Sequence, residues 1–150
     1  MNSALLIPLQ LLFTCALQIL FFQNMAFWDG YGVLIFHVLG ILLLPLNTRP
    51  IVLMIVSGTV GATIDFFAYG GGLFTSSAVA MALVLPIINR LLAPREGYEV
   101  TDEPNIKSMG LQWFSARTIA ALLVHNLWMF SMEAGRWELV TAGLGKAITS

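Results

Sequence analysis

The sequence predicts an all-α integral membrane protein with about six transmembrane helices and a cytoplasmic N-terminus. Hydrophobic residues make up 58% of the 150 residues and charged residues only 10%, whereas soluble domains carry about 25% charged residues. No acidic or basic residue precedes Asp29, and nearly half of all charged residues lie between Arg90 and Lys107. Long uncharged apolar runs must be helical in a bilayer, because only a helix pairs its own backbone polar groups there.

Turn-forming residues divide the chain into spans. A polar break surrounds Asp29, and Pro45 and Pro50 frame a tight turn, because neither proline fits inside a helix. Three consecutive glycines starting at Gly70 form another turn, and the segment 93–112 forms a charged loop. The predicted spans are residues 4–22, 31–46, 51–67, 73–92 and 113–132, with a sixth that begins near Trp137.

Three of these spans need comment. Residues 4–22 are interpreted as a retained span and not as a signal peptide, because no basic residue precedes the apolar run. Span 31–46 is short, so a half-inserted segment is the alternative. The last helix is either truncated at Ser150 or lies along the membrane interface. Residues 1–150 are expected to form a single domain.

The positions of lysine and arginine predict the orientation. With the N-terminus in the cytoplasm, the cytoplasmic loops hold Arg49, Arg90, Arg95 and Lys107. The turns on the opposite side hold only Arg136. This arrangement obeys the positive-inside rule, so the loop 93–112 is expected to face the cytosol.

Several functional classes find no support in the sequence. The net charge of -1 does not suit nucleic-acid binding, and Cys15 is the only cysteine, so no thiolate cluster can form. His37 and His125 have no carboxylate at metal-ligand spacing, and the zinc and serine-hydrolase motifs do not occur. Ser57 with His125 suggests an intramembrane serine protease only weakly. We expect no enzyme activity, no metal and no cofactor.

Ionisable residues inside predicted spans need a reason, because each costs about 2.5–3.5 kcal/mol on insertion scales. Asp65 predicts a helix–helix contact or a partner site, or else an interfacial carboxylate that touches water. Gly58 and Gly61, just before it, allow close helix approach. Glu133 with Arg136 is interpreted as a surface ion pair of little energetic value.

Arg117 and His125 lie near one face of span 113–132. Arg117 is close enough to the inner end for its side chain to snorkel to the interface. For His125, a polar contact inside the bundle is favoured over a proton relay. Gln10, Gln18 and His37 are further candidates for bridging helices.

The loop resembles a known family. Its residues Ala93-Pro94-Arg95-Glu96-Gly97-Tyr98-Glu99, followed by Met109-Gly110 and Trp113-Phe114, resemble the rod shape-determining protein MreD. Further similarities are the turn Thr48-Arg49-Pro50, the Gly58, Gly61 and Asp65 pattern, and the pairs His125-Asn126 and Phe130 with Glu133. The sequence departs from the family in its triple-glycine turn, in the loss of a second histidine after His125 and in its short final helix.

The resemblance implies a component of the rod complex in the bacterial inner membrane, with a fold similar to the substrate-binding subunits of energy-coupling-factor transporters. It implies a non-enzymatic scaffold that works with the bitopic protein MreC and, through it, with MreB and the peptidoglycan synthases of elongation. Helix faces would hold the span of MreC or a second copy of the chain. Cytoplasmic partners would contact Arg95, Glu96, Tyr98 and Glu99, unless the loop is a tether folded on the bundle. The alternative function is a vitamin-like small-molecule binding subunit of a transporter.

Overall fold

The structure, a computed structural model, describes residues 3–21, 26–27, 32–33, 35–68, 70–99 and 103–134, together with residue 148. In this part of the chain every long element is a helix, which confirms the all-α class, and the strands are a single antiparallel pair of two residues each. The elements are α1 (Ser3–Leu20), β1 (Ala26–Phe27), β2 (Gly32–Val33), α2 (His37–Leu42), α3 (Pro50–Ala68), α4 (Leu73–Leu91), α5 (Ile106–Met109) and α6 (Leu111–Ala134).

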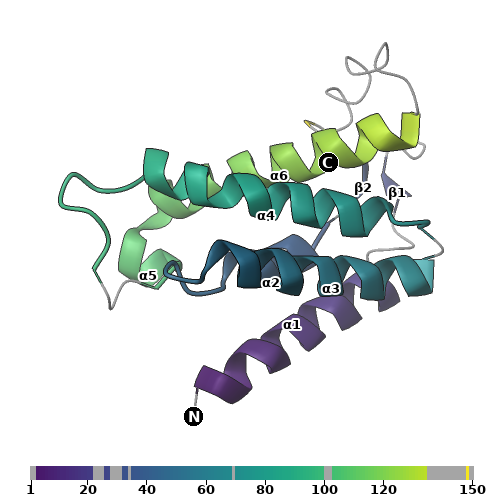
Figure 1. The fold of residues 1–150 in the computed structure, drawn as a ribbon, viewed down its shortest axis with the longest axis horizontal. Coiled ribbons are helices and arrows are strands. Elements are labelled where there is room, and N and C mark those ends of the chain that lie inside the picture. Colours follow the sequence, from purple (N-terminus) through teal and green to yellow (C-terminus); the bar gives the residue numbers. More distant parts are fainter. Residues whose placement is uncertain are drawn as a thin grey trace.

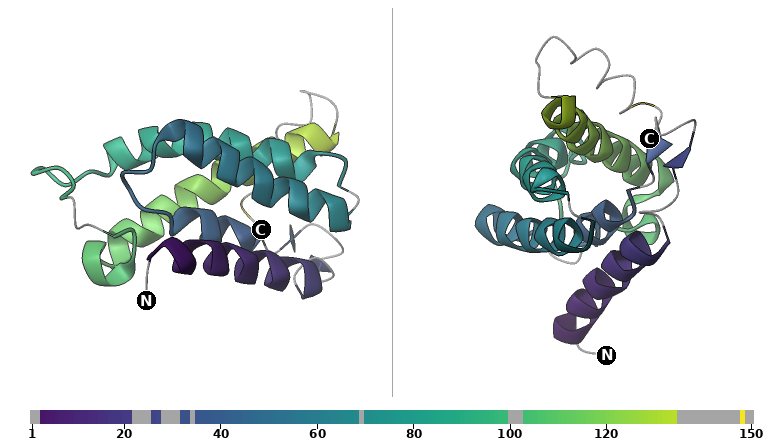
Figure 2. Two further views of the ribbon diagram at one scale, coloured as in Figure 1. Left: turned by 60° about the horizontal axis from the view of Figure 1, so that its bottom comes forward. Right: turned by 90° about the vertical axis from the view of Figure 1, so that its right-hand side faces the viewer.

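Helices α3, α4 and α6 form the body of a bundle (Figure 1). The short helix α2 packs among α1, α3 and α6, and α1 slants away from the bundle toward its own N-terminus (Figure 2). The fully buried side chains Ile41, Leu42, Ile64, Met81 and Leu85 form the centre of the apolar core. This core connects α2, α3 and α4 and positions the polar groups described below.

The connection between α3 and α4 depends on three glycines. A Cβ atom on Gly61 would lie 2.6 Å from both the Phe74 carbonyl oxygen and the Thr75 Cα, so only glycine lets α4 begin this close to α3. Gly71 and Gly72 adopt left-handed backbone angles, with φ of 61° and 95°, which L-residues with side chains rarely adopt. The close helix approach expected at Gly61 is therefore confirmed.

The helix predicted over 31–46 is much shorter in the described part of the chain. Its helical part, α2, has six residues, which at 1.5 Å per residue extends only about 9 Å. The helix begins where the Gln18 side chain accepts the backbone N–H of Phe36 and ends at the turn before Pro45. A membrane crossing by residues 31–46 and the half-inserted alternative both stay predictions.

The other described spans match predicted ones closely, as α1, α3, α4 and α6 coincide with residues 4–22, 51–67, 73–92 and 113–132 to within a few residues. By length and composition two of them, α3 and α4, are able to cross a membrane. The apolar run of α1, Leu5–Leu20, is shorter. The sixth predicted helix lies outside the described residues apart from residue 148, so the number of spans stays a prediction.

Four of the described basic residues gather at one end of the bundle. The turn before α3 and the segment between α4 and α6 lie at the same end as the start of α1, and the α3–α4 turn lies at the opposite end (Figure 1). Arg49, Arg90, Arg95 and Lys107 therefore share one end, which we call the loop end.

Candidate functional site

Polar side chains fill part of the bundle interior. The buried polar residues in the described chain come from all five helices that build the bundle, and they are Thr14, Gln18, His37, Ser57, Ser77, Arg117, His125 and Asn126. Burying a polar group without a hydrogen bond is costly, so each of them is informative about its neighbours. Their contacts define the candidate site.

His125 connects α6 to α4. Its Nε2 lies 3.1 Å from the Ser77 Oγ, and its Nδ1 lies 3.3 Å from the Asn126 Oδ1. A neutral imidazole has one donor and one acceptor nitrogen. The Ser77 hydroxyl has a single hydrogen, and its Oγ also lies 2.8 Å from the Leu73 carbonyl and 3.1 Å from the Phe74 carbonyl, so the donor in the Ser77–His125 contact depends on the imidazole tautomer. The contact inside the bundle that was predicted for His125 is therefore present.

The Ser77–His125 pair has the geometry of a nucleophile beside its base. Both side chains are fully buried, however, so no substrate can approach the hydroxyl in this arrangement. Ser57, the serine considered in the sequence, has no hydrogen-bond partner for its buried Oγ among the described residues. We interpret the Ser77–His125 contact as an interhelical hydrogen bond.

His37 packs against His125 without bonding to it. The two rings meet edge to face with centroids 5.2 Å apart, and the Phe74 ring lies 5.8 Å from the His37 ring on another side. Both ring nitrogens of His37 are buried and have no hydrogen-bond partner among the described residues. The described residues also contain no group of three or more His, Cys, Asp or Glu side chains suited to a metal ion.

Asp65 caps α4 from the neighbouring helix. Its Oδ1 accepts the backbone N–H of Phe74 at 3.1 Å, and its Oδ2 accepts the backbone N–H of Thr75 at 2.8 Å and the Thr75 hydroxyl. A helix N-terminus has unpaired N–H groups and a partial positive charge. Of the interpretations open for Asp65, the structure shows the helix–helix contact.

Two glutamines of α1 hold α2 in place. The Gln10 Nε2 donates to the Gly40 carbonyl at 3.0 Å, and the Gln18 Oε1 accepts the N–H groups at the start of α2. Gly40 lies so close to the Thr14 hydroxyl that any side chain there would collide with it. The predicted bridging role of Gln10 and Gln18 is confirmed.

Arg117 differs from its predicted snorkelling position. Only 2% of the residue is exposed, because its guanidinium turns inward to α4 and α2. Its Nε donates to the Asn89 Oδ1 at 2.7 Å and its Nη1 to the Leu42 carbonyl at 2.6 Å. The guanidinium also lies 5.4 Å from the centre of the Trp113 ring, within the range of a cation–π contact.

The loop after α4 folds back on the bundle at Tyr98. The Tyr98 hydroxyl donates to the Asn89 carbonyl, and the Trp113 Nε1 donates to the Leu92 carbonyl at 3.0 Å and to the Tyr98 oxygen at 3.3 Å. Arg95 and Glu96, which precede Tyr98, are exposed. The loop is therefore attached through its tyrosine and open at the two charged residues. Glu133 is exposed near the end of α6, and its expected partner Arg136 lies outside the described residues.

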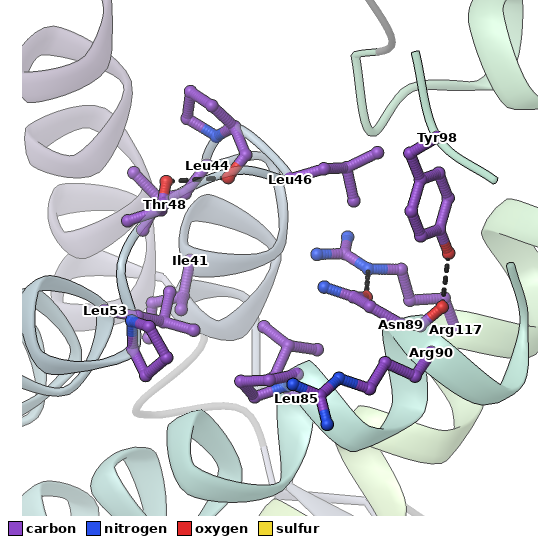
Figure 3. A pocket seen from close by; sticks show the side chains of 13 residues that line it. Ile41, Leu44, Leu46, Thr48, Leu53, Leu85, Asn89, Arg90, Tyr98 and Arg117 are labelled. Carbon is purple, nitrogen blue, oxygen red and sulfur yellow. Dashed lines mark hydrogen bonds between the residues drawn. The ribbon is translucent and has the colours of Figure 1, made fainter. Parts of the chain in front are cut away.

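A cavity of about 190 Å³ opens at the loop end beside Arg117 (Figure 3). Its wall is partly apolar, with Ile41, Leu44, Leu53 and Leu85, and partly polar, with Thr48, Asn89, Arg90, Tyr98 and Arg117. Figure 3 shows the Arg117 guanidinium pointing into this space next to Asn89. The described residues that line it include two arginines and no acidic residue.

The sequence did not single out Asn89 or Ser77. Asn89 bonds both to Arg117 and to Tyr98, and its only signal was an amide near the end of an apolar span. Ser77 is one of two adjacent serines early in α4, and nothing in the sequence distinguishes it from Ser76. Both residues gain their importance from contacts with α6, which lies far along the chain.

The site therefore consists of a polar interior that joins helices, a cationic cavity at the loop end and two exposed charges on the loop. No protein-family model, curated protein or solved structure matches this chain.

Proposed function

We propose that the chain is a non-enzymatic multi-pass scaffold of the bacterial inner membrane, of the MreD type, which couples an MreC-like bitopic protein to the machinery of cell elongation. The observation that carries the proposal is the distribution of polarity. Polar side chains point inward and bond one helix to another, while the outward faces are apolar. The resemblance in the loop segment supplies the identity of the proposed partners.

The outward faces support a lipid environment. Large apolar side chains that are exposed on the four long helices include Leu5, Leu9, Leu12 and Phe13 on α1, Ile51, Ile55, Phe66 and Phe67 on α3, Leu83, Ile87 and Leu91 on α4, and Ile119, Trp128 and Met132 on α6. Soluble monomers rarely expose contiguous apolar patches beyond a few hundred Å². In lipid the same faces carry no such penalty.

The polar interior supports a scaffold more than a catalyst. Asp65, Gln18 and His125 each bond to a neighbouring helix, which is how helices associate where no hydrophobic drive between them exists. A partner span would use the same kind of packing. The exposed apolar side of α1, which slants away from the bundle (Figure 2), offers a face for such a span.

The loop end supports contacts in the cytoplasm. Tyr98 attaches the loop to the bundle, while Arg95 and Glu96 stay exposed for charged partners. The surplus of arginine and lysine at this end suits the cytoplasmic side.

Cysteine labelling tests the membrane placement. The native Cys15 is buried and is replaced by serine as background. Single cysteines are introduced as Arg95→Cys at the loop end and as Glu133→Cys, an exposed position near the end of α6 at the opposite end (Figure 1). In intact cells, a reagent that cannot cross the inner membrane should label Glu133→Cys and not Arg95→Cys. Labelling of both residues, or of Arg95→Cys alone, rejects the topology.

Depletion in the host tests the function. Rod-shaped cells should become round, and the tagged protein should co-purify with the MreC-like protein of the same host. Unchanged shape together with a new nutrient requirement would reject the scaffold and support the transporter subunit. The matched control is depletion complemented by the unmodified chain.

A further inference from the structure

The cavity beside Arg117 contains a buried positive charge that no carboxylate of the described chain neutralises. A buried cation normally has a carboxylate beside it, because desolvation of an unpaired charge costs several kcal/mol. Among the described residues Arg117 bonds to an amide oxygen and a backbone carbonyl, and no carboxylate pairs with it. The two printed bonds use two of the five N–H donors of the guanidinium.

We propose that this cavity binds the phosphate group of an anionic amphiphile, with Arg117 as the principal ligand. Arginine presents a planar fork of donors that matches phosphate oxygens in a bidentate manner. Arg90 adds a second cation at the exposed edge, and the Asn89 side chain, held against Arg117, is a further polar group of the wall. No acidic side chain occurs among the described lining residues, which leaves the site attractive to an anion.

The form of the cavity favours a lipid headgroup over a soluble phosphate. The cavity joins a polar wall at Arg117 and Asn89 to an apolar wall at Ile41, Leu53 and Leu85, which suits a molecule with a charged head and a hydrocarbon tail. Its volume of about 190 Å³ is smaller than the roughly 300–1,000 Å³ of pockets that enclose a whole drug-sized ligand. A headgroup would fit while its tails remain in the bilayer.

The position of Arg117 along α6 is compatible with binding a lipid headgroup. The residue lies in the second turn of α6, about 9 Å from the start of the helix at 1.5 Å per residue. That position lies close to the headgroup region if the loop end faces the cytoplasmic leaflet, as proposed above. Basic pockets between helices on this side of a membrane are suited to anionic headgroups.

Native mass spectrometry of the full chain in detergent tests the inference. Phosphatidylglycerol, phosphatidylcholine, diacylglycerol and glycerol 3-phosphate are titrated separately. We expect a saturable complex with phosphatidylglycerol and none with diacylglycerol, which lacks the phosphate. Glycerol 3-phosphate distinguishes the sources: equally tight binding would identify a soluble phosphate compound as the ligand, and weak or no binding would identify the lipid. Equal binding of diacylglycerol and phosphatidylglycerol would overturn the proposal.

Two variants locate the site. Arg117→Gln should weaken phosphatidylglycerol binding at least about tenfold, since charge-assisted hydrogen bonds are lost, while Arg95→Gln, on the exposed loop, should leave it unchanged. Because Arg117→Gln also removes bonds to α4 and α2, Leu46→Trp serves as a second variant that fills the cavity and retains the arginine. Its matched control is Leu91→Trp on the exposed end of α4. Unchanged binding in folded Leu46→Trp would overturn the proposal.

The inference rests on the membrane placement but not on the scaffold role. Lipid binding in detergent is independent of the partner and of cell shape. If lipid binding shows no headgroup selectivity while cysteine labelling agrees with the topology, only the proposed lipid site in the cavity is rejected. If lipid binding is selective while depletion leaves the cell shape unchanged, only the proposed scaffold function is rejected.

Discussion

Asp65 holds Thr75 by two hydrogen bonds that end on the same carboxylate oxygen. Oδ2 accepts the Thr75 backbone N–H at 2.8 Å and also the Thr75 hydroxyl, while Oδ1 accepts the N–H of Phe74. The first turn of α4 thus receives its cap from the last turns of α3. One charged side chain fixes both the start of a helix and the angle at which the helix leaves the turn.

Replacing Asp65 by asparagine should destabilise the protein by about 1–3 kcal/mol. The amide keeps one acceptor oxygen, but its NH₂ group faces a backbone donor that loses its partner. The free energy of unfolding is measured by titration with sodium dodecyl sulfate in mixed micelles, followed by far-UV circular dichroism. Thr75→Val, which removes only the hydroxyl, should have a smaller effect. Equal stability of wild type and Asp65→Asn would show that the cap is dispensable.

Gly61→Ala should destabilise the helix pair, because the new methyl group would lie 2.6 Å from the Phe74 carbonyl oxygen and from the Thr75 Cα. Overpacking against backbone atoms costs about 1–3 kcal/mol. At Gly58 the nearest atom is a Val79 methyl group at 3.3 Å, and this side chain can rotate away. Gly58→Ala is therefore the matched control and should change stability by less than about 1 kcal/mol. The same micelle titration compares the two, and a reversed order would contradict the packing.

Some features of the fold could be predicted from short stretches of the sequence. The apolar runs predicted four of the helices. For Asp65 a helix–helix contact was one of the predicted alternatives, and the structure shows that the helix it contacts is the next one along the chain. The interface is local, since the bond partners Asp65 and Thr75 are ten residues apart. Helix periodicity and turn residues are enough to bring such neighbours together.

Contacts between segments that are distant in the chain could not be predicted from the sequence. The bond from Arg117 to Asn89 spans 28 residues and the bond from Arg117 to the Leu42 carbonyl spans 75, so the inward turn of the guanidinium depends on how three helices meet. The helix α2 was predicted too long because an apolar run has the same composition whether it faces lipid or protein. The cap from Gln18, a residue of α1, sets where this helix begins.

Tyr98→Phe should loosen the loop and leave the bundle folded. The change removes the bond to the Asn89 carbonyl and the acceptor for the Trp113 Nε1, which keeps its bond to the Leu92 carbonyl. Hydrogen exchange followed by mass spectrometry should show faster exchange at residues 93–99 with unchanged exchange in α3. Arg95→Gln, at an exposed position of the same loop, is the control and should exchange as wild type. Equal protection of residues 93–99 from hydrogen exchange in Tyr98→Phe and Arg95→Gln would mean that Tyr98 does not attach the loop.

Substitution by leucine should have opposite effects on stability at His37 and at His125, whose rings pack against each other. His37 has no hydrogen-bond partner for either ring nitrogen among the described residues, so His37→Leu removes buried polar atoms without breaking a bond. We expect stability that is unchanged or raised, by at most about 3 kcal/mol.

His125→Leu breaks the bonds to Ser77 and Asn126 and should cost about 1–3 kcal/mol, because the buried Asn126 amide loses a partner. Both variants are compared in the micelle titration. A destabilised His37→Leu would indicate that His37 has a polar partner of its own. A neutral His125→Leu would indicate that the bond between α4 and α6 contributes nothing, because the Ser77 hydroxyl already lies within hydrogen-bonding distance of the Leu73 and Phe74 carbonyls.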